Sequence, residues 1–536
     1  MPGVSSFRSN LFRAVRGASA GLLAAFAALA VAELVAGLVR PAAGPVTVVG
    51  GAVIDRTPAA VKDFAIRAFG ENDKTALQLG ILAVLALIAV ALGCLALSHR
   101  RAGVGGVLLF GVVGAIAALS RPDSAGVGDV LPSTAGALVG ALVLHVLASS
   151  AAPVPAPADA GGQDGAGAQD DAGGWNRRGF LIAAGVTAAA SASAGALGRV
   201  LSSRQGQGAV ASRETLILPR PASPAPALPA GAQLKIPGIS AFTTSGSDFY
   251  RVDTALTVPK VDARTWRLRI HGEGVAEPRT YSLDALLNRP LVERDITLTC
   301  VSNEVGGPYI GNARWLGVPL ADLLREAGVR PPSQGGAADQ LVARSVDGMT
   351  LGSPVEDVMD GRDAMLAVGM NGEPLPFDHG FPVRMLVPGL YGYVSACKWI
   401  TDIELTTFDA YDPYWVKRKW ARKAPIKTQS RIDTPKPFAR PTAGTVTIAG
   451  VAWAQHRGIT RVQIRVDDGP WQDADLAAQA GTDTWRQWFY RWNATPGGHN
   501  ITVRATDGTG RVQTERRTRT IPDGASGRHS VFVTVT

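Results

Sequence analysis

Cysteine is scarce in this sequence, with three residues in 536, namely Cys94, Cys300 and Cys397. Three thiols cannot form the disulfide framework that holds small secreted domains together. Cys94 lies in an apolar run and is most simply a small buried hydrophobic residue. A bridge between Cys300 and Cys397 is a weak alternative to two free thiols.

Histidine is also scarce, and of the seven residues only His99 and His145 fall near the apolar runs of the N-terminal part. A haem b between membrane helices needs facing histidine ligands, so we expect no haem. The net charge of +9 is spread over many arginines and forms no basic stripe. We therefore expect no nucleic-acid binding, and a basic surface facing anionic lipid is the simpler interpretation.

Long apolar runs are confined to the first two hundred residues. They predict five transmembrane helices, although two of the runs are short for a bilayer and a count of three is the alternative. The runs are Ala14–Val39, Ala76–Leu97, Val104–Leu119, Thr134–Ser149 and Gly179–Val200. Arginines gather before the first, third and fifth runs, which places the N-terminus inside. Five spans then put everything after Val200 on the outer side of a bacterial cell membrane.

The fifth run follows Asn-Arg-Arg-Gly-Phe-Leu-Ile at 176–182, which looks like a twin-arginine export signal. That route carries folded proteins, as a domain that takes up its cofactor in the cytoplasm would need. The alternative is that Arg177 and Arg178 only anchor a membrane span. We expect the run to stay as an anchor, with cleavage near Ala196 as the other outcome.

Composition divides the chain into four parts: a membrane region 1–201, a Pro/Ala-rich linker 202–240, an α+β domain 241–425 and an all-β domain 426–536. The linker cannot bury enough apolar surface to fold by itself. Strand-like runs separated by Asp-Gly and Pro-Gly turns recur in the last part and predict an immunoglobulin-like sandwich. We expect its tryptophans, Trp471 among them, to pack in the core and on the sheets rather than to form a ligand platform.

Cys300 ends an alternating run, Asp295–Thr299, and a glycine-rich turn follows it. A thiolate at the end of a strand can reach a metal in a space lined by loops. On these residues alone a buried structural cysteine is supported equally well.

Several motifs, in one consistent order, resemble the sulfite oxidase-type molybdopterin-dependent oxidoreductases over about residues 245–536. In the first domain they are Ser247–Gly272, Thr297-Leu-Thr-Cys300, Trp315-Leu-Gly-Val-Pro-Leu, His379-Gly-Phe-Pro-Val-Arg384 and Tyr391–Trp399. In the last domain Val451–Trp453, Val466–Trp471 and Pro522–Ser530 are similar to the family's dimerisation domain. The resemblance implies a membrane-anchored bacterial member of this family with an α+β molybdopterin domain.

The same resemblance implies a molybdenum–molybdopterin cofactor whose metal is ligated by Cys300. It assigns cofactor contacts to eight positions: Tyr250, Arg251, Ser345, His379, Arg384, Ser395, Ala396 and Lys398. Arginine, lysine and glycine-rich backbone suit a buried phosphate. Asp347 is a weaker candidate from the loop that follows Ser345.

The chain departs from the sulfite-oxidising branch around this site. Aligned on Val258-Pro259, it has Asp253-Thr254-Ala255 in place of an Arg-Asn-His run, and Glu304-Val305 where that branch has arginines after the metal cysteine. Sulfite is a dianion that converging arginines would balance, so we expect a neutral or cationic substrate. Our candidates for catalytic residues are Cys300, Asn303, Glu304 and Tyr391. We expect the last three of these and Tyr393 to line the substrate pocket.

We therefore expect a membrane-anchored, extracytoplasmic molybdenum oxidoreductase that transfers an oxygen atom to or from a substrate other than sulfite. Reduction of oxidised protein methionine is one form of that hypothesis. No haem domain precedes the molybdenum domain, so electrons pass to or from a separate protein or quinol, and the resemblance allows a homodimer through the C-terminal domain. The alternatives are a membrane-tethered binding or structural protein with an inactive cofactor-like domain, and an adhesin exported by the general secretory route. Substrate, direction of electron flow and partner stay open.

Overall fold

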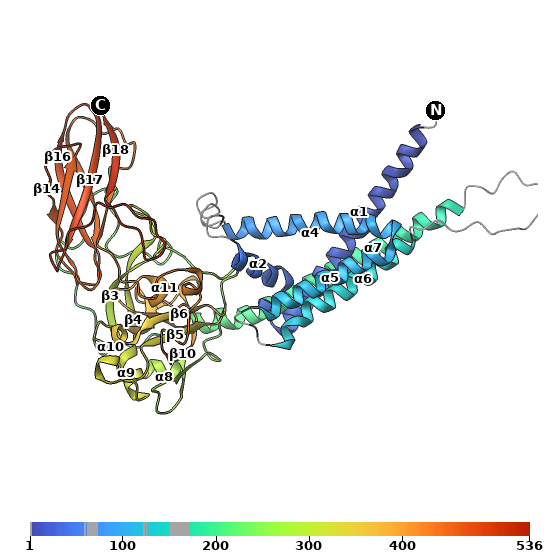
Figure 1. Ribbon diagram of the computed structural model, residues 1–536, viewed down its shortest axis with the longest axis horizontal. Coiled ribbons are helices and arrows are strands. Elements are labelled where there is room, and N and C mark those ends of the chain that lie inside the picture. Colours follow the sequence, from blue (N-terminus) through green and yellow to red (C-terminus); the bar gives the residue numbers. More distant parts are fainter. Residues whose placement is uncertain (1–2, 58–60, 62–72, 122–123, 125, 151–171) are drawn as a thin grey trace, which may run out of the picture. The chain divides into compact units, whose positions relative to one another are not determined.

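The computed structural model of the chain describes all residues except 1–2, 58–60, 62–72, 122–123, 125 and 151–171 (Figure 1). The chain forms two compact units. The first consists of Met1–Gly208 with Ala255–Thr257, and the second of Ala209–Thr254 with Val258–Thr536.

The first unit is helical. Its main helices are α1 (Gly3–Val39), α2 (Pro45–Arg56), α4 (Asp73–Ser98), α5 (Arg100–Leu119), α6 (Leu131–Ser150) and α7 (Ala172–Glu214). Small residues let the helices approach closely, because a Cβ on Gly21 of α1 would overlap the backbone of Ala89 in α4. Within the described residues, five helices are long and apolar enough to cross a membrane, by length and composition. The expected number of apolar helices is therefore confirmed.

α7 departs from the expected boundary at residue 201, because the helix continues through Glu214. Its last turns are held by the second unit: the Ser212 hydroxyl accepts the Ala263 N–H, and Arg213 donates to the carbonyls of Pro374 and Leu375. The twin-arginine motif lies at the start of α7, and the side chains of Arg177 and Arg178 fall outside the described residues.

The rest of the expected linker is an arm that lies along the second unit. Ala222 donates its N–H to the Leu291 carbonyl, and Ser240 donates its N–H to the Asp433 carboxylate. The Leu234 N–H is accepted by the side chain of Gln487. Although its composition gives the arm no core of its own, these hydrogen bonds to other segments satisfy its backbone and order it.

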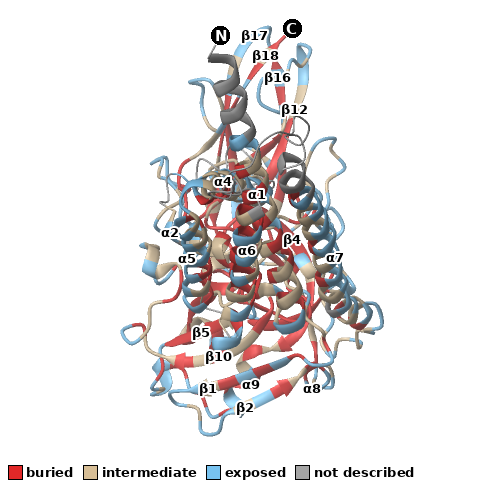
Figure 2. Ribbon diagram, turned by 90° about the vertical axis from the view of Figure 1, so that its right-hand side faces the viewer, coloured by how far each residue is buried: buried red, intermediate tan, exposed pale blue. Residues whose placement is uncertain are grey.

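The first domain of the second unit has two sheets, ordered β2-β1-β10-β5-β6 and β3-β4-β7-β8, with β9 paired to β7. The strands are β1 (Arg267–Gly272), β2 (Arg279–Ser282), β3 (Val292–Thr299), β4 (Ile310–Pro319), β5 (Gln340–Ser345), β6 (Thr350–Pro354), β7 (Met365–Met370), β8 (Glu373–Pro374), β9 (Arg384–Leu386) and β10 (Ile400–Thr406). Short helices connect them: α8 (Leu283–Leu287), α9 (Leu320–Glu326), α10 (Val355–Met359) and α11 (Gly392–Ser395). Figure 2 shows buried residues concentrated on these strands. The domain is α+β, as expected.

The second domain is a sandwich of two antiparallel sheets, β11-β12-β16-β15 and β14-β13-β17-β18. The strands are β11 (Gln429–Thr434), β12 (Gly444–Trp453), β13 (Ile459–Val466), β14 (Gln472–Asp473), β15 (Asp475–Leu476), β16 (Arg486–Ala494), β17 (Gly497–Asp507) and β18 (His529–Val535). Trp488 and Trp492 pack in its core, as predicted. Trp453 and Trp485 pack instead with the core of the first domain, and the Trp485 indole donates to the Phe242 carbonyl. Trp471 lies outside the core, half-buried at the surface among arginines of a sheet.

Candidate cofactor site

Cys300 directly follows β3, whose pairing with β4 brings Thr299 opposite Ile310. Its N–H donates to the Tyr309 carbonyl, so the Cys300 loop (301–309) starts and closes beside the cysteine. The thiol is free and buried, and its Sγ accepts the Ser302 N–H at 3.4 Å. Burial raises the pKa of the Cys300 thiol, and the Ser302 N–H and the Lys398 charge offset part of this rise. Since a metal ligand must be a thiolate, metal binding here would release a proton.

The Cys300 loop is closed by Asn303, whose buried Oδ1 accepts the Tyr309 N–H at 2.8 Å. Glu304 is exposed, and its backbone carbonyl accepts the Gly307 N–H. The Asn303 amide oxygen is thus engaged within the loop, and the Glu304 side chain faces solvent.

Tyr250 connects the cysteine to the cationic part of the site. Its ring stacks on Phe249 with centroids 5.2 Å apart. Burial raises the pKa of Tyr250, the Cys300 charge raises it further, and Arg384 lowers it. This phenol therefore stays protonated and lies within electrostatic range of both groups.

His379 and Arg384 flank a turn whose Gly380 has a φ of +108°, a conformation that favours glycine. His379 Nε2 lies 2.9 Å from the Gly246 carbonyl oxygen. Burial, aided by the Arg384 charge, lowers the pKa of His379 to about 4, so the ring is neutral. Because a carbonyl only accepts, Nε2 carries the proton and Nδ1 is left as an acceptor.

Arg384 is buried at the start of β9, and its guanidinium lies over the Trp315 ring at 5.1 Å from the centroid. Nη1 donates to the His379 carbonyl, whereas Nε has no hydrogen-bond partner among the described residues. Burial lowers the pKa of Arg384 to about 10, which leaves it charged at neutral pH. A buried cation with an unused donor is costly unless an anion binds beside it.

Lys398 supplies a second cation close to Arg384 and Gly380. A Cβ on Gly380 would lie 3.1 Å from the Arg384 Cβ and 3.1 Å from the Lys398 Cα. The Lys398 ammonium donates to Asp253 Oδ2 at 2.7 Å, and Arg251 Nε donates to the same oxygen at 3.0 Å. Asp253, with 4% of its side chain exposed, therefore forms ion pairs with both Arg251 and Lys398, two residues predicted to contact the cofactor.

The remaining predicted residues lie on the strands and loops around this centre. Ser345 ends β5 beside Ile400, and the buried Ser395 hydroxyl donates within its own turn, to the carbonyls of Leu390 and Tyr391. Ala396 is half-buried next to it. Tyr391 is buried, and its hydroxyl accepts the Lys427 N–H. The Tyr393 hydroxyl donates to the Ala421 carbonyl.

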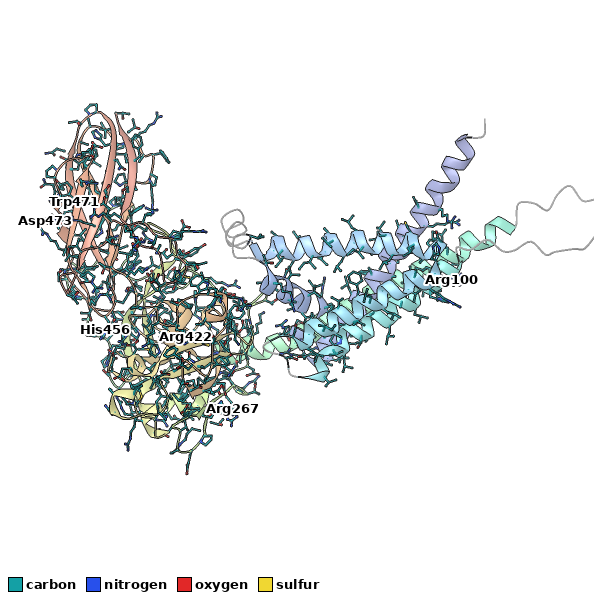
Figure 3. The ribbon with its side chains drawn as sticks, viewed as in Figure 1. Arg100, Arg267, Arg422, His456, Trp471 and Asp473 are labelled. Carbon is teal, nitrogen blue, oxygen red and sulfur yellow. The ribbon has the colours of Figure 1, made fainter. Side chains whose placement is uncertain are left out.

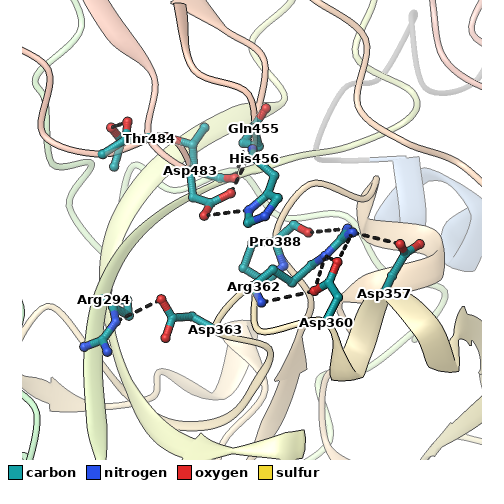
Figure 4. Close-up of polar contacts among 12 residues, drawn as sticks. Arg294, Asp357, Asp360, Arg362, Asp363, Pro388, Gln455, His456, Asp483 and Thr484 are labelled. Atoms are coloured by element: carbon teal, nitrogen blue, oxygen red, sulfur yellow. Dashed lines mark hydrogen bonds and ion pairs between the residues drawn. The ribbon is translucent and has the colours of Figure 1, made fainter. Parts of the chain in front are cut away.

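A polar network fixes the turn before α11 (Figure 4). Arg362 donates to the Pro388 carbonyl and forms ion pairs with Asp357 at 2.8 Å and Asp360 at 2.6 Å. Across the turn, His456 of the β-sandwich domain contacts Asp483. A hydrogen bond to Asp483 raises the pKa of His456, despite some burial. Both domains contact this turn, because a Cβ on Gly389 would lie 3.3 Å from Arg362 Nη1 and 3.3 Å from the His456 Cβ.

The structure therefore brings together Cys300, Tyr250, His379, Arg384 and Lys398, and adds Asp253. Asp253 was identified in the sequence only as a departure from the sulfite-oxidising pattern. Its place two residues after Arg251 was the available signal. Gly380, inside the His-Gly-Phe-Pro-Val-Arg motif, is the other residue whose role appears only in three dimensions.

These residues fit an anionic cofactor that brings a metal. Arg384 Nε is buried and unused among the described residues, and His379 offers a neutral acceptor. Arg384 and Lys398 match a phosphate, and the missing Cβ of Gly380 leaves room beside them. The His379 acceptor matches a pterin ring, whose N–H groups need an acceptor. Cys300 then supplies one thiolate to the metal.

Both domains of the second unit are similar in sequence to known protein families. Residues 255–415 match the family described as oxidoreductase molybdopterin binding domain, and residues 429–503 match that of bacterial Ig domains. The mitochondrial sulfite oxidase of Mus musculus is 32% identical over 274 residues, which are 44% of this chain and 50% of that protein. Nitrate reductase [NADH] 1 of Oryza sativa subsp. japonica is 34% identical over 183 residues, 30% of this chain and 20% of that protein.

Among solved structures, the sulfane dehydrogenase SoxCD of Paracoccus pantotrophus has a TM-score of 0.48 and 26% identity, and the match covers 55% of this chain and 82% of that chain. The chain spans about half the length of the sulfite oxidases that it matches. Cys300, His379, Arg384 and Lys398 all lie inside the matched domain. Residues 255–415 are therefore an oxidoreductase molybdopterin-binding domain of the sulfite oxidase type, which implies a molybdenum–molybdopterin cofactor.

Proposed function

We propose that this protein is a membrane-anchored, extracytoplasmic molybdenum oxidoreductase that transfers an oxygen atom to or from a substrate other than sulfite. The observation that carries this proposal is the buried Arg384, which lies close to Tyr250 and Cys300. Its Nε has no partner among the described residues and is available to an anion. The cofactor, when bound, supplies a metal that exchanges an oxygen atom and a pair of electrons with the substrate. Cys300 holds the metal, Arg384 and Lys398 hold the anionic tail, and His379 orients the ring.

Asp253 supports the part of the proposal that concerns the substrate. Its carboxylate lies between Arg251 and Lys398, at 3.0 and 2.7 Å, and is almost fully buried. It balances positive charge that could otherwise attract a dianion. A neutral or cationic substrate suits this arrangement, and a sulfoxide such as oxidised methionine is one neutral candidate.

We expect the purified wild-type protein to hold about one molybdenum per chain and to oxidise sulfite, with an artificial acceptor, well below the 1–1000 per second common for enzymes. In Asp253→Asn the isosteric amide removes one negative charge, so kcat/KM for sulfite should rise about 10-fold. Metal analysis and steady-state kinetics measure both.

Two outcomes would contradict the proposal separately. If the wild-type protein holds no stoichiometric molybdenum, the remaining hypothesis is a membrane-tethered binding protein. Rapid sulfite oxidation by the wild type would retain the molybdenum enzyme but remove the claim about its substrate. Arg267→Gln, on the exposed face of β1, is the control for a general effect of surface charge.

The membrane anchor is supported by five long apolar helices and by large side chains that they leave exposed, such as Leu87 at 71% and Leu79 at 63%. Exposed leucines in such number are costly in water and suit a lipid environment. Electron exchange with a separate protein or quinol, and a homodimer through the β-sandwich domain, complete the proposal.

Export by the twin-arginine route is tested by replacing Arg177-Arg178 with Lys-Lys. We expect the second unit to become inaccessible to protease added to intact spheroplasts, because the pair is read by a receptor rather than as charge alone. The matched control replaces Arg100-Arg101, between the second and third apolar helices, in the same way. A second unit that stays outside in the first variant would favour the general secretory route.

A further inference from the structure

Three arginines stack on one tryptophan at the surface of the β-sandwich domain, where Figure 3 labels Trp471. The guanidinium carbons of Arg465, Arg504 and Arg528 lie 5.0, 4.2 and 5.1 Å from the indole centroid. Arg465 comes from β13, Arg504 from β17, and Arg528 directly precedes β18. We call these four residues the Trp471 cluster.

The cluster lies on the outer face of the sheet β14-β13-β17-β18. Val462 and Ile464 of β13 point into the core, so Arg465, next along the strand, points outward. Val503 and Ala505 of β17 likewise leave Arg504 on the outer face. Trp471 therefore contributes nothing to the core of the sandwich, and cation–π contacts at the surface stabilise a fold only slightly.

Carboxylates balance the positive charge of the cluster only in part. Arg528 pairs with Glu515 at 2.8 Å, and Asp473 is paired with Arg461 outside the cluster. Within the described part of the chain, Arg465 and Arg504 have no carboxylate within 4.0 Å. Burial lowers the pKa of Arg504, the charges of its neighbouring arginines lower it further, and the Asp473 charge offsets part of this shift.

Unused donors accompany the excess charge. The Nε atoms of Arg465 and Arg528 are buried and have no hydrogen-bond partner among the described residues. On the outer face of the same sheet, Phe532 is 45% exposed. The centroid of its ring lies 6.5 Å from that of Phe438, which is 79% exposed. Arginine and large aromatic residues are the types enriched at the centres of protein interfaces.

We propose that the Trp471 cluster is the docking surface for an acidic protein, and that this protein is the redox partner of the molybdenum site. The second half of this inference rests on the proposed function. Carboxylates of the partner supply the counter-charges that Arg465 and Arg504 lack, and its apolar surface covers the two phenylalanines. A two-fold contact between copies of this chain would instead bring two arginine clusters together.

The cluster is joined to the metal site by consecutive residues. His529 follows Arg528, and its ring lies against Gly306 of the Cys300 loop, where a Cβ would overlap it. His529 Nδ1 accepts the Ile432 N–H at 3.0 Å, which fixes the ring. Arg431, also in the sandwich, donates to the Gly307 carbonyl at 2.9 Å. A partner on the cluster would therefore dock beside a segment of the sandwich that packs against the Cys300 loop.

The test compares two forms of one probe, native cytochrome c, which is basic, and cytochrome c with succinylated lysines, which is acidic. Binding to the full-length, molybdenum-loaded protein in detergent is followed by sedimentation of the haem absorbance at increasing salt. We expect the succinylated form to bind more tightly, with an affinity that falls as salt rises. Arg465→Glu and Arg504→Glu should each weaken it about 10-fold. Arg267→Glu, the same charge change on the other domain, should not.

A second measurement follows haem reduction after the protein has been reduced with dithionite and freed of the excess, each ferric haem taking one electron. We expect the succinylated form to be reduced faster and the two cluster variants to lose that difference. Equal binding of both probes, or unaltered binding by Arg465→Glu and by the milder Arg504→Gln, would overturn the docking surface. Binding that the variants abolish without faster haem reduction would overturn the redox role alone, and metal analysis reports separately on the proposed function.

Two other occupants would also overturn the proposal. Dimers of the wild type that dissociate in Arg465→Glu would assign the cluster to a second copy of the chain. Binding of the proteolytically released second unit to vesicles of anionic lipid, lost in the same variant, would assign it to the membrane. Wild-type thermal stability of each variant is required before its binding is compared.

Discussion

Replacing Arg384 by methionine is expected to lower the pterin and molybdenum content of the purified protein about 100-fold or more. The guanidinium is buried, and its Nε has no partner among the described residues, so the cofactor's anionic tail is the group that it lacks. Truncating one partner of a buried, hydrogen-bonded charge pair costs about 2–5 kcal/mol of binding free energy. Released pterin, measured by fluorescence after denaturation, and molybdenum, measured by mass spectrometry, report the loss.

The same variant has an opposite effect on the cofactor-free protein. Methionine removes a buried charge and keeps an apolar contact with Trp315, so the cofactor-free fold should be at least as stable as the wild type. Arg384→Lys keeps the charge but loses the planar fork, and should retain more cofactor than Arg384→Met. Wild-type cofactor content in Arg384→Met, or a strongly destabilised cofactor-free protein, would assign Arg384 to the fold rather than to the cofactor.

Patterns in the sequence predicted those elements whose stability is local. Alternating runs gave the strands of both domains, and the lengths of the apolar runs gave five membrane-type helices. The arm after α7 could not be predicted, because its order depends on bonds such as Ala222 to Leu291 that join distant segments. The surface position of Trp471 could not be predicted for a similar reason, since its neighbours Arg465 and Arg504 come from β13 and β17, and Arg528 directly precedes β18.

Residue types and family resemblance predicted which residues form the site. They did not predict how those residues contact one another. The ion pair of Asp253 with Lys398 joins residues from opposite ends of the domain, and no local pattern reveals it. Asn303 and Ser395 have chemistry that suits a ligand, yet the structure engages the Asn303 amide oxygen and the Ser395 hydroxyl in backbone hydrogen bonds of their own loops. Local closure of a loop and ligand binding use the same donors and acceptors, so sequence alone does not separate them.

Cys300→Ser is expected to separate metal chemistry from cofactor retention. A serine hydroxyl is far less acidic than a thiol and would not replace a thiolate at neutral pH. Losing outer residues of a metal site costs about 10–100-fold in activity, so losing the protein's own ligand should lower turnover at least 100-fold. Pterin content should stay within about 2-fold of the wild type, because Arg384 and Lys398 still hold the anionic tail.

Absorption spectra give a readout that a purely structural cysteine would not change. The band from charge transfer between the Cys300 sulfur and the metal should disappear in Cys300→Ser, while Cys94→Ser, a matched change in α4, should keep both band and turnover. Loss of pterin together with metal would mean that Cys300 maintains the fold of its loop. Burial raises the pKa of the Cys300 thiol, so only a bound cation makes its deprotonation favourable at neutral pH. Unchanged turnover in Cys300→Ser would mean that another group holds the metal.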